Sequence, residues 1–316
     1  MPSRRSHLQN TALYFPFSAA PFTKSPIPIP KSPNPNVVGY QNITIPAVKV
    51  ANSAEYHFKT VTFKIVGTAT DEQYFDITDM TPKKADGSDW ISSNSDASGI
   101  RNNQMTFQKI SLAGAYTDRV QWLSKAPAGG FTGWQTFPRD GSAAVPLKKG
   151  DFVLKKGEAL IIVYNKAYAC NLQVSGEVEL QDQSFLIPAV AVANSAEYHF
   201  IGNNTPAPVD MTKVQLKKAD GSDWISSNSD ASGVRNNQMT FQKISLAGAY
   251  TNRVQWLSKA PAGGITGWQT FPKDGSAVQP LKDGDYILQP GDGLIVVYNK
   301  SVGCKVIFPL PITPAE

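Results

Sequence analysis

The sequence predicts an all-β protein built from two tandem β-sandwich or jelly-roll-like domains, preceded by an extended, proline-rich N-terminal arm. Three observations lead to this expectation: a long internal repeat, short strand-like segments between turn residues, and a start rich in proline. The chain has 316 residues, of which 41% are hydrophobic and 17% are charged. This composition supplies enough apolar side chains for packed cores, and the length is that of about two domains.

We expect residues 1–42 to form the arm, because they have no counterpart elsewhere in the chain. The segment SPIPIPKSPNPN has proline at nearly alternate positions, which favours an extended polyproline II backbone. Before it, an apolar stretch contains Tyr14, Phe15 and Phe17. The arm is either a tail or a remnant of export, or a segment whose three aromatic residues contact a neighbouring subunit. The second interpretation explains why an apolar stretch is tolerated outside a domain.

The remainder of the chain consists of two copies, expected at 43–182 and 183–316 and joined closely at QDQSF, residues 181–185. IPAVKVANSAEYHF begins at Ile45 and returns as IPAVAVANSAEYHF at Ile187, an offset of 187 − 45 = 142. KKADGSDW begins at Lys83 and returns at Lys217, an offset of 217 − 83 = 134. The first copy therefore has eight extra residues (142 − 134) between these two blocks.

One polar segment, KKADGSDWISSNSDASG, is identical in both copies, whereas strand-like segments differ by conservative exchanges such as Phe152 to Tyr286. A polar loop without a partner should change faster than a core, where volume and pattern limit exchange. Either the duplication is recent and unevenly changed, or both loops contact equivalent partners. The candidate contact or ligand residues are Asp86, Asp89, Trp90, Asn94 and Asp96, with Asp220, Asp223, Trp224, Asn228 and Asp230 in the second copy.

Short runs rich in Val, Ile, Tyr and Phe predict strands. ALIIVYN in the first copy and GLIVVYN in the second are almost continuously apolar, so we expect central strands buried on both faces. Turns are predicted at Asp86-Gly87, at Lys149-Gly150-Asp151 and at Lys156-Gly157-Glu158, because Gly and Asp favour turn conformations. Trp122 and Trp134, with their counterparts in the second copy, are expected in the core or at its mouth.

The Asp-rich loops are a weak candidate for calcium, which prefers clustered oxygen ligands. Their spacing does not match an EF-hand, and Asp, Ser and Asn are common in turns, so we expect no metal and no cofactor. Trp90, Trp122 and Trp134 could stack on sugar rings, with core packing as the simpler alternative. The equivalent cysteines Cys170 and Cys304 are expected to be buried thiols, since a disulfide needs Cα atoms within about 7 Å.

No catalytic motif accompanies His57 or its counterpart His199, so each is expected to be a hydrogen-bonded strand residue and the protein is not expected to be an enzyme. The net charge of +5 is dispersed along the chain, which argues against a nucleic-acid partner. No apolar run approaches the roughly 18 residues of a membrane span. Arg4 and Arg5 precede an apolar stretch broken by prolines, an ambiguous export signal.

These features predict a structural subunit that assembles with copies of itself into an extracellular filament or surface layer, through its repeats and its arm. Heterologous contacts between identical subunits generate rings or open filaments. Two alternatives remain: a component of a virion shell or fibre, and a carbohydrate-binding adhesion module with two equivalent glycan sites.

Overall fold

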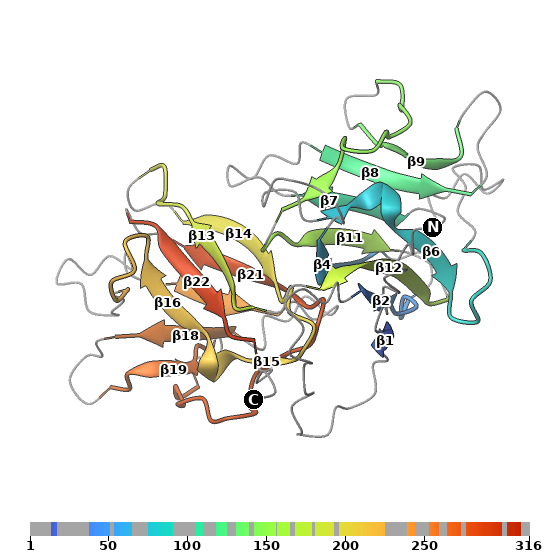
Figure 1. The fold of residues 1–316 in the computed structure, drawn as a ribbon. Helices are drawn as coiled ribbons and strands as arrows, with labels where there is room; N and C mark the ends of the chain where they lie inside the picture. Colours follow the sequence, from blue (N-terminus) through green and yellow to red (C-terminus); the bar gives the residue numbers. More distant parts are fainter. Residues whose placement is uncertain are drawn as a thin grey trace, which may run out of the picture.

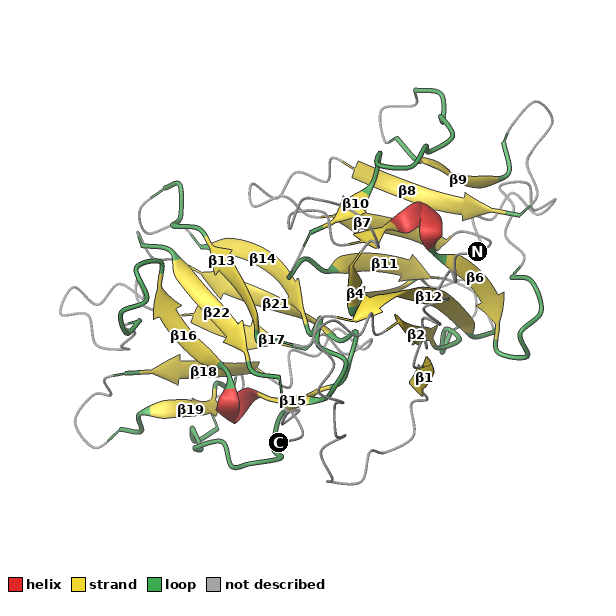
Figure 2. Ribbon diagram, viewed as in Figure 1, coloured by secondary structure: helices red, strands yellow, loops and turns green. Residues whose placement is uncertain are grey.

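The computed structural model is all-β, with several antiparallel sheets and, among the residues that it describes, two single-turn 3₁₀ helices (Figure 2). It describes residues 14–17, 38–50, 54–64, 75–90, 105–109, 118–124, 131–138, 142–155, 157–164, 168–178, 181–192, 196–224, 239–243, 253–258, 264–272, 276–298 and 302–310. The strands form two groups that lie side by side, one from each half of the sequence (Figure 1).

The first half contains a five-stranded antiparallel sheet in the order β3-β11-β7-β8-β9. Its strands are β3 (Glu55–Lys59), β11 (Leu160–Tyr164), β7 (Met105–Lys109), β8 (Asp118–Leu123) and β9 (Gly133–Thr136). In a second sheet, β12 pairs with β2, β4 and β6, and β2 also pairs with β1. These strands are β1 (Tyr14–Phe17), β2 (Val38–Ile45), β4 (Phe63–Lys64), β6 (Thr81–Lys84) and β12 (Cys170–Val178). The short strands β5 (Phe75–Asp76) and β10 (Val153–Leu154) pair beside the 3₁₀ helix η1 (Ile77–Asp79).

Most of these pairings recur in the described part of the second half, where the five-stranded sheet has the order β14-β21-β17-β18-β19 and the pairings of β1 and β4 have no counterpart. Its strands are β14 (Glu197–Gly202), β21 (Gly293–Tyr298), β17 (Met239–Gln242), β18 (Arg253–Leu257) and β19 (Gly267–Thr270). A three-stranded sheet contains β13 (Gln183–Ile187), β22 (Cys304–Phe308) and β16 (Gln215–Lys218). The strands β15 (Val209–Asp210) and β20 (Ile287–Leu288) pair beside η2 (Met211–Lys213).

Each half has its own hydrophobic core. The first core includes Phe107 and Ile162, and the second includes their counterparts Phe241 and Val296, all with 0% of their surface exposed. The expected core tryptophans are confirmed: the Trp134 indole donates to the Met80 carbonyl at 3.0 Å. Trp268 does the same to the Val214 carbonyl, also at 3.0 Å. The indole nitrogens of Trp134 and Trp268 are therefore satisfied by backbone rather than by another side chain.

The central strands lie where the sequence predicts them, since β11 lies between β3 and β7 and β21 lies between β14 and β17. Burial on both faces is nearly complete for β11, in which only Val163 is partly exposed. It is incomplete for β21, where Ile295 and Val297 on one face are partly exposed. The expectation of full burial therefore holds better in the first half than in the second.

The predicted turns are also found. Gly87 and its counterpart Gly221 have φ angles of +82° and +85°, in the left-handed region that a residue with a Cβ atom rarely adopts. Gly150 and Gly157 likewise have positive φ. Turn chemistry was a reliable guide here because it depends on neighbouring residues and not on distant packing.

The expected arm and the first sheet overlap in sequence. Strand β2 begins at Val38, so residues 38–42 pair with β12 as part of the sheet. The proline-rich segment 25–36 lies outside the described residues. Between the halves, the expected connection at residues 181–185 is short, because β13 already begins at Gln183. Within the described part of the chain, no helix is long and apolar enough to cross a membrane.

Candidate functional site

The Asp-rich loops, one in each half, close tight turns. The Asp86 carboxylate accepts hydrogen bonds from the Ser88 backbone N–H at 2.9 Å and from the Ser88 hydroxyl at 2.6 Å. These bonds lower the pKa of Asp86. Asp220 makes the same two bonds with Ser222, at the same distances. Both carboxylates therefore stabilise a turn over a glycine with positive φ.

The next carboxylate in each loop forms an ion pair on the surface. Lys83 contacts Asp89, and Lys217 contacts Asp223, with N–O distances of 2.6 Å in both halves. The hydrogen bond and the charge of each lysine lower the pKa of its Asp partner. Exposed pairs of this kind contribute little to stability.

These contacts weaken the case for calcium at the loops. Among the described residues, no group of three or more His, Cys, Asp or Glu side chains is arranged to hold a metal ion. The remaining candidates in the loops, Asn94 and Asp96 and their counterparts Asn228 and Asp230, lie outside the described residues.

Trp90 and Trp224 are buried, whereas a residue that contacts a ligand must be exposed. They are 1% and 0% exposed, so both indoles lie inside the cores. The Trp90 indole N–H donates to the Tyr164 hydroxyl at 3.2 Å, and the two rings lie 6.1 Å apart. A role in stacking on sugar rings, or in contacting another subunit, does not fit this burial. Core packing, the simpler of the two alternatives given for this tryptophan, is what the structure shows.

The two strand histidines are buried on the core side of β3 and β14, with 7% and 5% of their surfaces exposed. Burial lowers the pKa of both His57 and His199 to about 4. We expected hydrogen-bonded histidines, but Nε2 of each has no hydrogen-bond partner. The neighbouring Glu55 and Glu197 instead accept from the backbone N–H groups of Lys49 and Ala191, at 2.7 and 2.6 Å. In both halves, therefore, the glutamate beside the histidine holds a backbone N–H group of its own repeat.

The cysteines lie as expected: neither forms a disulfide, and Cys170 and Cys304 are both fully buried, one in each core. Burial raises the pKa of Cys170 to about 12. Because the thiolate is the reactive form, this thiol should be inert near neutral pH.

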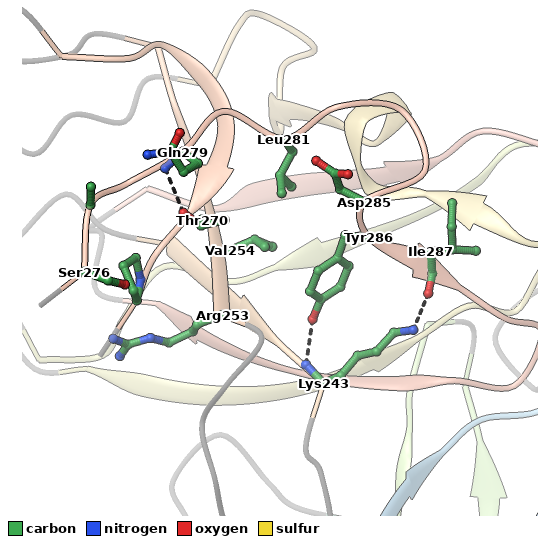
Figure 3. A pocket seen from close by; sticks show the side chains of 12 residues that line it. Lys243, Arg253, Val254, Thr270, Ser276, Gln279, Leu281, Asp285, Tyr286 and Ile287 are labelled. Carbon is green, nitrogen blue, oxygen red and sulfur yellow. Dashed lines mark hydrogen bonds between the residues drawn. The ribbon is translucent and has the colours of Figure 1, made fainter. Parts of the chain in front are cut away.

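A pocket of about 650 Å³ that the sequence did not suggest opens on the second half (Figure 3). Its lining includes Lys243, Arg253, Asp285 and Tyr286. The Tyr286 hydroxyl accepts from the Lys243 backbone N–H at 2.7 Å, and the Lys243 ammonium donates to the Ile287 carbonyl. Sequence comparison of the repeats contained one signal for this site, since Tyr286 replaces Phe152.

The charged side chains that line the pocket make contacts with other residues of the same repeat. Lys243 pairs with Asp292 at 3.1 Å, and the Arg253 guanidinium lies over the Phe271 ring at 4.3 Å while its Nε donates to the Phe271 carbonyl. Asp285 accepts from the Lys282 backbone N–H at 2.8 Å. The pocket walls are therefore held by internal contacts, and the hydroxyl gained at Tyr286 is satisfied by one of them.

The arm has one described element, β1, which pairs with β2 in parallel from Tyr14↔Val38 to Phe17↔Gln41. The other described strand pairs are antiparallel. Tyr14, Phe15 and Phe17 thus lie on a strand at the outer edge of a sheet, although this sheet belongs to the same chain.

In comparisons with known proteins, no family model and no curated protein matches the chain.

Proposed function

We propose that this protein is a non-enzymatic structural subunit that assembles with copies of itself into a filament or surface layer outside the cell. Each repeat is a β-sandwich module in this proposal, and the N-terminal arm links one chain to the next. The single observation that carries the proposal is β1, a strand from the arm that adds to the edge strand β2.

An edge strand presents unpaired N–H and C=O groups that an added strand satisfies. Parallel pairing within one chain needs a long connection, commonly a dozen or more residues. Residues 18–37 connect β1 to β2, which is twenty residues (37 − 17). A connection of that length in polyproline II geometry reaches roughly 60 Å. Such a reach is enough for β1 to pair with the β2 strand of an adjacent chain.

Matched apolar residues on the two repeats support the same proposal. Tyr56 and Tyr198 are both 53% exposed, and Val50 and Val192 are both 65% exposed. Each pair occupies equivalent repeat positions, so one chain presents the same apolar spot twice. Leu186 is 55% exposed without such a counterpart, since the equivalent residue in the first repeat is Thr44. Equivalent spots suit contacts with successive identical neighbours.

The carbohydrate-binding alternative has less support, because Trp90 and Trp224 are buried. No observation favours a virion component over another kind of assembly.

Disulfide trapping tests whether the arm links two chains. Pro16 pairs in register with Tyr40, whose side chain is partly exposed. We therefore expect a chain with Pro16→Cys, mixed with a chain with Tyr40→Cys, to form a disulfide-linked heterodimer under mild oxidation. The native thiols should not compete, since both are buried.

The matched control is a single chain with both substitutions. If the arm pairs only within its own chain, the double variant gives an internal disulfide and the mixture gives no heterodimer, which contradicts the proposal. A Pro16→Cys chain mixed with a Thr44→Cys chain, four positions out of register, should link much less.

A further inference from the structure

The two repeats meet through backbone hydrogen bonds that come in matched pairs. By the offsets of the repeat, Thr60 corresponds to Gly202 and Gly157 corresponds to Gly291. The Thr60 N–H donates to the Gly291 carbonyl at 2.9 Å, and the Gly202 N–H donates to the Gly157 carbonyl at 3.2 Å. Each bond is thus the image of the other with the repeats exchanged. This is the reciprocity of a twofold interface, in which residue i contacts j and j contacts i.

Further contacts repeat the pattern. Lys59 forms an antiparallel β-bridge with Asp292. The corresponding residues, Ile201 and Glu158, form the same bridge with the repeats exchanged. Phe58 stacks on its own counterpart Phe200, with ring centroids 5.2 Å apart and planes 10° apart. A residue stacks on its counterpart only next to the symmetry axis. The junction therefore has an internal pseudo-twofold axis that passes beside these two rings.

The side chains at this axis are unlike. A Cβ atom added to Gly202 would lie 2.3 Å from the Thr60 methyl carbon. The Thr60 hydroxyl donates to the Glu158 carbonyl at 2.6 Å and accepts from the Asn204 amide at 2.9 Å. The axis thus has room for one threonine side chain, and two facing threonines would overlap.

At two further positions of the junction, the residue in one repeat also differs from its counterpart in the other repeat. A Cβ added to Gly293 would lie 2.7 Å from the Phe58 carbonyl carbon, whereas the counterpart of Gly293 is Ala159. Lys59 forms an ion pair with Asp292 across the junction at 3.2 Å, whereas its counterpart Ile201 bears no charge. These differences make each face complementary to the other face rather than to itself.

We infer that residues 58–60 with 157–159 form a pairing surface whose partner is the corresponding surface of a second repeat, residues 200–202 with 291–293. This surface rejects another first repeat, because two copies of Thr60 would meet at the axis. A second chain binds here only by offering its second repeat in an exchange of repeats. The inference does not depend on assembly through the arm.

The test exchanges the two residues at the axis in the full-length chain. Gly202→Thr alone should lower the midpoint of thermal unfolding by roughly 5 °C, because the added side chain overlaps Thr60. Adding Thr60→Gly should restore more than half of that loss. By the symmetry of the repeats, the exchanged threonine faces the Asp292 carbonyl, the counterpart of the Glu158 carbonyl that accepts from Thr60. That carbonyl lies 3.0 Å from a Cβ added at Gly202, so it must shift by a few tenths of an ångström, and recovery is therefore expected to be incomplete.

Thr60→Gly alone should lower the midpoint as well, since the bonds of its hydroxyl are lost, so recovery in the double variant requires that the positions face each other. A double variant that loses at least the sum of the two single losses would overturn the inference. As a control, Ile162→Val and Val296→Ile exchange equivalent residues in separate cores, and their effects should add. If Gly202→Thr does not fold, Gly202→Ala with and without Thr60→Gly provides the same comparison.

Discussion

At the scale of single residues, the fold constrains the charge of His57 and His199. Burial holds the pKa of each histidine near 4. The positive charge of Lys59 lowers the pKa of His57 further, and the negative charge of Glu55 opposes this. An unfolded histidine has a pKa of about 6.5. As the pH falls below 6.5, the unfolded chain binds protons that the folded chain does not, so the free energy of unfolding decreases until the pH reaches about 4.

We predict that acidification from pH 7.5 to pH 5 costs roughly 2 kcal/mol for each of the two histidines. Urea unfolding at several pH values measures this loss. A variant with His57→Asn and His199→Asn removes both titrations, so its stability should depend less on pH over this range. Equal slopes for the variant and the parent would show that the histidines are not buried as neutral groups.

The position of Trp90 was left open by the sequence. Trp90 stands in a polar segment and was a candidate contact residue, with core packing as the simpler alternative, and the structure places it in the core. Burial of one side chain depends on the packing of β11 and the Tyr164 hydroxyl, which are distant in sequence. Asp86 and Gly87 were predictable because their turn is closed by Ser88, two residues away.

At the scale of elements, the 3₁₀ helices η1 and η2 show how both repeats anchor a short connection. The Asp210 carboxylate accepts from the Thr212 backbone N–H at 2.9 Å and from the Gly284 backbone N–H at 2.7 Å. Asp76 contacts Thr78 and Gly150 in the same way. One side chain thus caps a helix turn and fixes a loop more than seventy residues away in sequence, since 284 − 210 = 74.

We predict that Asp210→Ala lowers the free energy of unfolding by about 1–2 kcal/mol, because a cap and a loop contact are lost together. Asp76→Ala should cost a similar amount. Asp223→Ala is the control, since this carboxylate is exposed and should matter little. Chemical denaturation measures the three variants, and an effect of Asp223→Ala as large as that of Asp210→Ala would contradict this account.

The elements also show the limits of the sequence. Repeat offsets, turn glycines and the apolar runs of β11 and β21 predicted where strands lie and which are central. They did not predict the junction, because Thr60 and Gly202 lie where the two copies begin to differ. Neither residue has a notable local pattern, and each matters only through the other repeat. The pocket beside Tyr286 was missed for a different reason, because its lining comes from segments of the second repeat that are far apart in sequence, from Lys243 to Ile287.

At the scale of the whole molecule, two cores, one junction and one added strand form a chain with repeated surfaces. The junction forms at the ends of β3 and β14, and Tyr56 and Tyr198, nearer the start of these strands, are exposed. Strand β1 makes a different contact: it adds to the edge of a sheet, at β2, and does not take part in the junction between the repeats. Together these features describe a chain whose two repeats are joined at its centre. In the proposed function, the arm joins this chain to others.

Negative-stain electron microscopy of the full-length chain and of a chain lacking residues 1–37 tests the central proposal most directly. This truncation removes β1 and the connection but leaves β2 intact, because β2 begins at Val38. The full chain should form filaments, sheets or rings, whereas the truncated chain should remain folded and monomeric. A full chain that stays monomeric, or a truncated chain that assembles equally well, would contradict the account.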